Sequence, residues 1–237
     1  MEKIEFIIPK TKNISKNVDI KKEYNEISDI NKSKNTGGYR QISPNLYRFN
    51  TSYINQNDDI YLMYNNACDL KKTDVHSAIN VFKKCYELIS NDIKHSIQYE
   101  ICINLSLLLT DTNGSYEEIE KYYKKAINIF SDRSEPYYYW AIYCNKQQKF
   151  EKSYELLTIA LSLKYEDAII KYSETQRYAY DKYLFDELAV SCFWLKKYDE
   201  SKLLLEKIID DPDFSSSRER LLKNLEFTNE ELEKYVK

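Results

Sequence analysis

Two short acidic runs, Asp186-Glu187 and Asp210–Asp213, and two histidines are the first candidates in this chain for acid–base or metal chemistry. Asp186 and Glu187 are adjacent, so on a helix their carboxylates project about 100° apart and do not form a ready acid–base pair. We expect Asp186 to cap a helix or bond the preceding loop, and Glu187 to reach a Lys or Arg of a neighbouring helix. The run Asp210–Asp213 contains a proline, which indicates a turn rather than a cation site. His76 and His95 are isolated, so the sequence predicts no catalytic residue, no metal site and no cofactor.

Seven residues in the second half of the chain could contact a binding partner. They are Arg133, Glu135, Tyr137, Tyr138, Trp140, Tyr183 and Asp186. The aromatic rings could form a stacking platform for a peptide or a glycan, although packing between helices is the simpler interpretation for Trp140 and Tyr138. Arg133 and Glu135 could contact a ligand, or they could fix a loop by pairing with the following helices.

Composition excludes several classes of protein. The 237 residues include only 3 Gly and 4 Pro, too few for a turn-rich β fold or a phosphate-loop enzyme. The net charge of −3 gives no general attraction for nucleic acid or anionic membranes. The longest apolar run, 101–109, is too short to span a bilayer. Five scattered cysteines and the absence of a secretion signal lead us to expect a reduced, cytoplasmic protein.

Two stretches, 141–160 and 189–208, repeat one pattern of small and apolar residues. The first contains Ala141, Phe150, Ser153, Leu157 and Ala160, and the second contains Ala189, Tyr198, Ser201, Leu205 and Ile208. The identical spacing predicts a two-helix unit in which the small residues let the helices approach closely. One unit cannot bury its own apolar stripe, so several must stack. We therefore expect an all-α fold, a short right-handed α-solenoid of helix hairpins.

Helical periodicity begins near residue 58. The expected helices cover 58–70, 74–89, 91–109, 115–130, 136–146, 149–163, 181–196, 198–210 and 216–227, with a short one from Asn229. Residues 164–180 indicate an insertion between units. The matched positions Leu157 and Leu205 are 48 residues apart, whereas Tyr123 and Leu157 are 34 apart.

Capping residues mark several of these helix starts. The expected N-terminal caps are Asp58 or Asp59, Thr73 or Asp74, and Ser115 with Glu118 as its capping-box partner. We expect His76 to lie in a turn, and Asn113-Gly114 to supply a left-handed turn between two helices.

Residues 1–55 differ from the rest and are expected to form an extended or partly disordered basic arm, followed by the repeat domain at 56–237. Residues 1–50 hold 10 Lys and Arg against 6 Asp and Glu, whereas the remainder holds 25 against 32. Within the arm, Lys3–Ile8 could form a strand that Pro9 stops.

The hairpin pattern resembles the tetratricopeptide repeat (TPR) family. Residues 131–227 also resemble the helical-repeat module found beside glycosyltransferase domains in bacterial and giant-virus proteins. That second resemblance depends on Arg133, Glu135, Pro136, Asp186, Glu187, Tyr198, Glu200, Arg220, Asn224 and Phe227. No nucleotide-binding α/β region precedes the module, which puts the activity of such relatives in doubt for this chain.

These features favour a scaffold, not an enzyme, that binds a protein partner through the concave face of the array. An accessory component of a glycosyltransferase system, or a glycan-binding module, is the first alternative. A structural subunit of a larger assembly, such as a viral one, is the second. We expect no nucleic-acid or membrane partner, and the sequence leaves the oligomeric state open.

Overall fold

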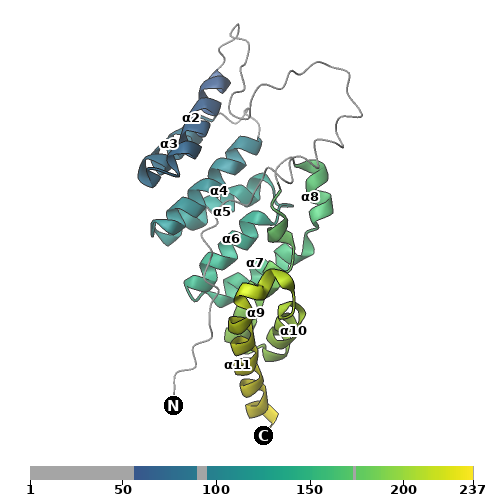
Figure 1. The fold of residues 1–237 in the computed structure, drawn as a ribbon. Coiled ribbons are helices and arrows are strands. Elements are labelled where there is room, and N and C mark those ends of the chain that lie inside the picture. Colours follow the sequence, from purple (N-terminus) through teal and green to yellow (C-terminus); the bar gives the residue numbers. More distant parts are fainter. Residues whose placement is uncertain (1–55, 90–94, 173–174, 237) are drawn as a thin grey trace. The chain divides into compact units, whose positions relative to one another are not determined.

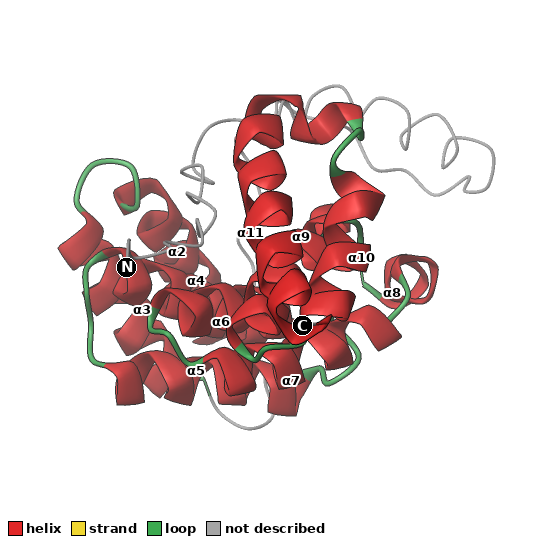
Figure 2. Ribbon diagram, turned by 90° about the horizontal axis from the view of Figure 1, so that it is seen from below, coloured by secondary structure: helices red, strands yellow, loops and turns green. Residues whose placement is uncertain are grey.

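The computed structural model describes residues 56–89, 95–172 and 175–236, and in these ranges every regular element is helical (Figures 1 and 2). The α-helices are α2 (Gln56–Leu70), α3 (Val75–Leu88), α4 (His95–Asp111), α5 (Tyr116–Ile129), α6 (Glu135–Lys146), α7 (Phe150–Ser162), α8 (Tyr165–Lys171), α9 (Tyr183–Trp194), α10 (Tyr198–Ile208) and α11 (Arg218–Val236). Two short 3₁₀ helices, η1 (Arg177–Tyr180) and η2 (Pro212–Ser217), precede α9 and α11. The basic arm predicted for residues 1–55, with its strand, lies outside the described residues.

The helices pack in consecutive pairs, as the repeat pattern predicts. The pairs are α2–α3, α4–α5, α6–α7 and α9–α10. Each pair contacts the next through α3 with α4, α5 with α6, and α7 with α9, and α11 then packs on α10 (Figure 1). The prediction of an all-α array of helix hairpins is therefore confirmed.

Small residues lie at the close crossings within the two matched pairs. Ala141, Ala189, Ser153 and Ser201 are all fully buried. The Ser201 hydroxyl donates a hydrogen bond of 2.9 Å to the carbonyl of Ala189 on the preceding helix. The burial of these residues and the Ser201 hydrogen bond confirm the register that the sequence predicts for the hairpin. A larger side chain at these positions would push the two helices apart.

Three hairpin turns share one backbone geometry that does not use glycine. Asn113, Gln148 and Lys196 have φ of 55°, 57° and 61°, in the left-handed region. In each turn the next amide N–H bonds the carbonyl five residues earlier, as in Lys149 to Cys144 and Lys197 to Cys192, both at 2.8 Å. Asn113, and not Gly114, is thus the left-handed residue of its turn. A Cβ at Gly114 would lie 3.1 Å from Leu109, so this glycine permits close packing instead.

Two of the predicted helix caps are confirmed. Asp74 accepts a hydrogen bond from the Ser77 amide at 3.0 Å, and Ser115 accepts one from the Glu118 amide at 3.2 Å. The Glu118 carboxylate pairs with Lys83 of α3 at 2.6 Å, so it links two neighbouring pairs.

Three boundary predictions are wrong. Helix α2 begins at Gln56, so Asp58 and Asp59 lie inside it and do not precede it. His76 lies in the first turn of α3. The final two helices are one, α11, and neither Gly nor Pro interrupts it.

The insertion predicted at 164–180 contains α8 and η1. Helix α7 contacts α9 directly, so the repeat continues past the inserted segment. The 3₁₀ helix η1 contacts α6, α7 and α9. The insertion thus lies against α6 and α9, the first helices of two successive pairs.

Candidate functional site

The seven residues predicted to contact a partner lie mostly inside the protein. Six of them, namely Arg133, Glu135, Tyr137, Tyr138, Trp140 and Asp186, are at most 7% exposed. Tyr183, at the start of α9, is half-buried. All seven belong to α6, to the loop before it or to the first turn of α9, and α6 contacts α9. The sequence therefore located one region of the fold, in which Tyr183 alone of the seven is accessible.

Arg133 and Glu135 form a buried ion pair. The Nε and Nη2 atoms of Arg133 donate to the two carboxylate oxygens of Glu135 at 3.3 and 2.9 Å, and Nη1 lies 3.4 Å from Glu100 of α4. Burial disfavours the charged guanidinium, but the hydrogen bonds to Glu135 and the negative charges of Glu135 and Glu100 together outweigh that effect, so the pKa of Arg133 is raised. The guanidinium also lies 4.2 Å from the centre of the Tyr99 ring. This arrangement joins α4 to the start of α6.

The same carboxylate of Glu135 holds the insertion in place. It accepts hydrogen bonds from the amide of Gln176 and from the hydroxyl of Tyr180, both at 3.0 Å. Next to it, Ser134 donates from its hydroxyl to the carbonyl of Ala179 and from its amide to the Tyr180 hydroxyl. Glu135 thus fixes the insertion against the first turn of α6, as the loop-fixing interpretation of this residue required.

The aromatic residues of α6 are used in packing. Trp140 stacks on Tyr123 of α5 with ring centres 6.2 Å apart and planes 9° from parallel. Tyr138 meets the edge of Tyr178 of η1 at 6.0 Å, and the Tyr137 hydroxyl donates to the carbonyl of Ser131 at 3.0 Å. Packing between helices, one of the two interpretations of the sequence, describes the contacts of these rings.

Asp186 has the role that was expected of Glu187, and Glu187 has neither of the expected roles. Asp186 accepts two hydrogen bonds from the guanidinium of Arg220 in α11, at 3.0 and 2.6 Å. Burial raises the pKa of Asp186, while Arg220 lowers it. Asp186, rather than Glu187, therefore reaches the basic side chain of a neighbouring helix. The pair joins α9 to α11 with the geometry that a carboxylate and a guanidinium prefer.

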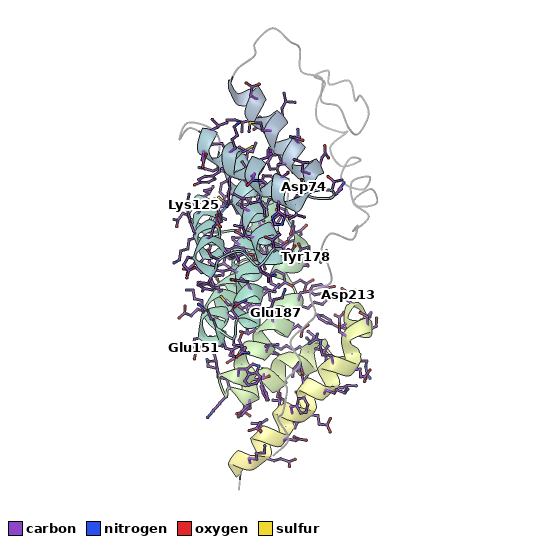
Figure 3. All side chains as sticks on the ribbon, turned by 90° about the vertical axis from the view of Figure 1, so that its left-hand side faces the viewer. Asp74, Lys125, Glu151, Tyr178, Glu187 and Asp213 are labelled. Atoms are coloured by element: carbon purple, nitrogen blue, oxygen red, sulfur yellow. The ribbon has the colours of Figure 1, made fainter. Side chains whose placement is uncertain are left out.

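Glu187, labelled in Figure 3, is buried as well and belongs to a polar network that the sequence did not reveal. Asn145 of α6 donates from Nδ2 to the Glu187 carboxylate at 2.9 Å and to its carbonyl at 3.0 Å. Ser191 in turn donates to Oδ1 of Asn145 at 2.8 Å. Burial, with the nearby charge of Asp186, raises the pKa of Glu187 to about 7. The sequence held one indication of this network: Asn145 lies one helical turn after Ala141, so both residues share one face of α6.

The insertion itself forms most of a surface cleft, where the sequence suggested none. Its volume is about 220 Å³, and its lining residues come from the end of α7, the start of α8, η1 and the loop after η1. The rings of Tyr165 and Tyr180 meet edge to face at 5.8 Å, and the Arg177 guanidinium lies 5.7 Å from the centre of the Tyr165 ring. Lys164, Glu166 and Asp181 complete its charged lining. The break in the 34-residue period was the only sequence signal for this feature.

Metal and membrane features were also sought in the described residues. No group of three or more His, Cys, Asp and Glu side chains there could hold a metal ion. Cys85, Cys102, Cys144 and Cys192 are buried free thiols, and Cys68 is a partly buried one. None of the described helices combines the length and the apolar character needed to cross a membrane.

Comparison with solved structures identifies the architecture. Two crystal structures of nearly identical TPR-like repeats from Podosopora anserina, described for that protein as repeats of a kinesin light chain, align with the helix pairs. One, a point variant, gives a TM-score of 0.56 at 13% identity over 77% of this chain and 90% of that chain. The other gives a TM-score of 0.55 at 14% identity with the same coverage.

The fold is that of a TPR-like α-solenoid. At this identity the likeness concerns the fold alone. No family model matches the sequence, and no curated protein matches it either. The TPR-like array is interrupted by the insertion, which lies against α6 and α9.

Proposed function

We propose that this protein is a non-catalytic scaffold that binds a protein partner at the cleft formed by its insertion and the end of α7. The observation that supports the proposal most directly is that the buried carboxylates are hydrogen-bonded within the fold and hold its segments together. The carboxylates of Glu135, Asp186 and Glu187, which could have served acid–base chemistry, are buried and hydrogen-bonded to Arg133, Arg220 and Asn145. Each of them joins neighbouring segments of the array, and that is a structural task.

The insertion cleft is the proposed contact surface. Lys164 and Arg177 provide positive charge and Glu166 and Asp181 negative charge within one lining. All four side chains are exposed. Such a mixture suits an extended peptide with both charge signs better than an apolar helix, because each charged group then finds a partner at the rim.

The buried candidate residues hold the inserted segment that supplies part of the cleft lining. Glu135 holds the backbone of the insertion at Gln176, and Tyr138 packs on the Tyr178 ring. Tyr183, two residues after Asp181 of the cleft, stays half-buried and is the predicted site residue best placed to touch a partner. TPR-like arrays present rigid surfaces of this kind because each pair is held by its neighbours.

The test is affinity capture of the full chain from a lysate of its native source, with stoichiometry measured by mass spectrometry. We expect one protein at a fixed ratio, lost with the double substitution Lys164→Glu and Arg177→Glu. Lys84→Glu, a charge reversal at an exposed site on α3, is the matched control and should retain the partner. Capture of no stoichiometric protein, or equal capture by the cleft variant, would contradict the proposal. Binding to a glycan array or hydrolysis of a nucleotide-sugar would favour the glycosyltransferase-related alternative.

A further inference from the structure

Helix α11 carries an apolar seam along the border of its contact with the array, and the array covers this seam only in part. Leu222, Leu225, Asn229 and Leu232 follow the spacing of alternating three and four residues. At about 100° per residue this spacing keeps them within one narrow arc of the helix. Leu222 is 41% exposed, whereas Leu225 and Leu232 are partly buried and pack with one side against the hydrophobic core. We call these four residues the α11 seam.

The two borders of the α11 seam differ. On one side α11 faces the array through the buried residues Leu221, Asn224 and Thr228. On the other side the same helical geometry places a stripe of four glutamates, namely Glu219, Glu226, Glu230 and Glu233. Glu219 pairs with Lys223 at 3.4 Å. The other three have no ion-pair partner within 4 Å among the described residues. The seam is therefore apolar in its centre and acidic along its open edge.

We infer that the α11 seam binds an amphipathic helix of a protein partner, with Leu-type residues facing the seam and Lys or Arg along the edge that faces the glutamates. The leucine spacing matches the a and d positions of a coiled-coil interface, and Asn229 at an a position fixes the register of the incoming helix. The acidic stripe selects a basic partner, because a like charge there would be repelled. A second copy of this chain is disfavoured for the same reason, since its own glutamates would meet this stripe. The α11 seam shares no residue with the insertion cleft, so this surface is additional to the one proposed above.

The test uses a synthetic peptide of three heptads with Leu at a and d, one Asn at the central a position, and Lys at e and g. Its binding to the full-length protein is measured by fluorescence anisotropy at low salt. A second peptide, with Glu replacing every Lys, is the matched probe. We expect the Lys peptide to bind at least tenfold more tightly than the Glu peptide, and added salt to reduce the difference.

Two variants tie the binding to the α11 seam. Leu222→Asp should weaken the Lys peptide at least tenfold, whereas Leu203→Asp, at a leucine of α10 that is 54% exposed, should leave binding unchanged. The triple charge reversal Glu226→Lys, Glu230→Lys and Glu233→Lys leaves the buried face intact and should reverse the preference toward the Glu peptide. Equal binding of the two peptides, no reversal in the triple variant, or self-association that depends on Leu222 would each overturn the inference. Because the insertion cleft is untouched in these variants, failure here leaves the scaffold proposal and its own test unaffected.

Discussion

Ionisation of Glu187 should control much of the pH dependence of folding stability. Its pKa is raised from 4.5 to about 7 by burial and by the charge of Asp186, with Asn145, Arg220 and Lys146 opposing the shift. The unfolded chain ionises near the ordinary value, so the proton stabilises the folded state. That stabilisation is complete below pH 4.5 and is lost as the pH rises through about 7. One pKa unit corresponds to about 1.4 kcal/mol, so the loss amounts to about 3 kcal/mol.

The substitution Glu187→Gln removes this ionisation while keeping an oxygen that can accept the hydrogen bond from Asn145. We expect the variant to match the wild type near pH 4.5 and to exceed its free energy of unfolding by up to about 3 kcal/mol near pH 8. The assay is urea unfolding followed by circular dichroism at a series of pH values. Subtracting the two curves cancels the contribution of the titrating groups that do not interact with Glu187.

The matched control is Glu151→Gln on α7, where the side chain is exposed (Figure 3). Its stability difference from the wild type should be small and should not change with pH. If the difference between wild type and Glu187→Gln were also independent of pH, Glu187 would not titrate inside the fold and the reasoning would be refuted.

Three further substitutions probe the joints of the array. Ala189→Leu should overpack the crossing of α9 and α10 and lower the free energy of unfolding by about 1–3 kcal/mol, measured by thermal melting; an unchanged melting temperature would show that the helices are not in close contact there. Arg220→Ala should cost about 3 kcal/mol near neutral pH because it leaves the buried carboxylate of Asp186 without its partner, and Asp186→Asn in the same chain should recover part of that loss in a double-mutant cycle. Ser115→Ala should cost about 1 kcal/mol by removing the N-terminal cap of α5, with Ser115→Asp as the substitution that preserves it.

The helix pairs could be predicted because their signals are local. The repeated spacing of Ala141 with Ser153, and of Ala189 with Ser201, reflects steric limits that act within a single hairpin. Capping by Asp74 and Ser115 is equally local, since each side chain bonds an amide three residues away. Features of this kind depend on short stretches of chain, and the printed sequence contains all that is needed to infer them.

The surroundings of the candidate residues could not be predicted because they depend on contacts between distant segments. Glu135 meets Gln176 and Tyr180, which are 41 and 45 residues further along the chain. Asp186 meets Arg220 34 residues away. The sequence showed that these residues carry charge, but only the packing of the insertion and α11 determines which of them stay accessible. That is why Tyr183 remains half-buried while its neighbours in the prediction are covered.

Hydrogen exchange of the full chain, resolved by mass spectrometry, tests the central claim that the polar and aromatic residues of α6 and α9 are structural joints of the array. Every residue of α6 from Glu135 to Asn145 is buried, as is every residue of α9 from Asp186 to Phe193. We expect the amides of α6 and α9 to exchange slowest, and those of α8, where Ala168 is the buried residue, to exchange fast. Exchange in α6 as fast as in α8 would show that this region is open, and would contradict the account.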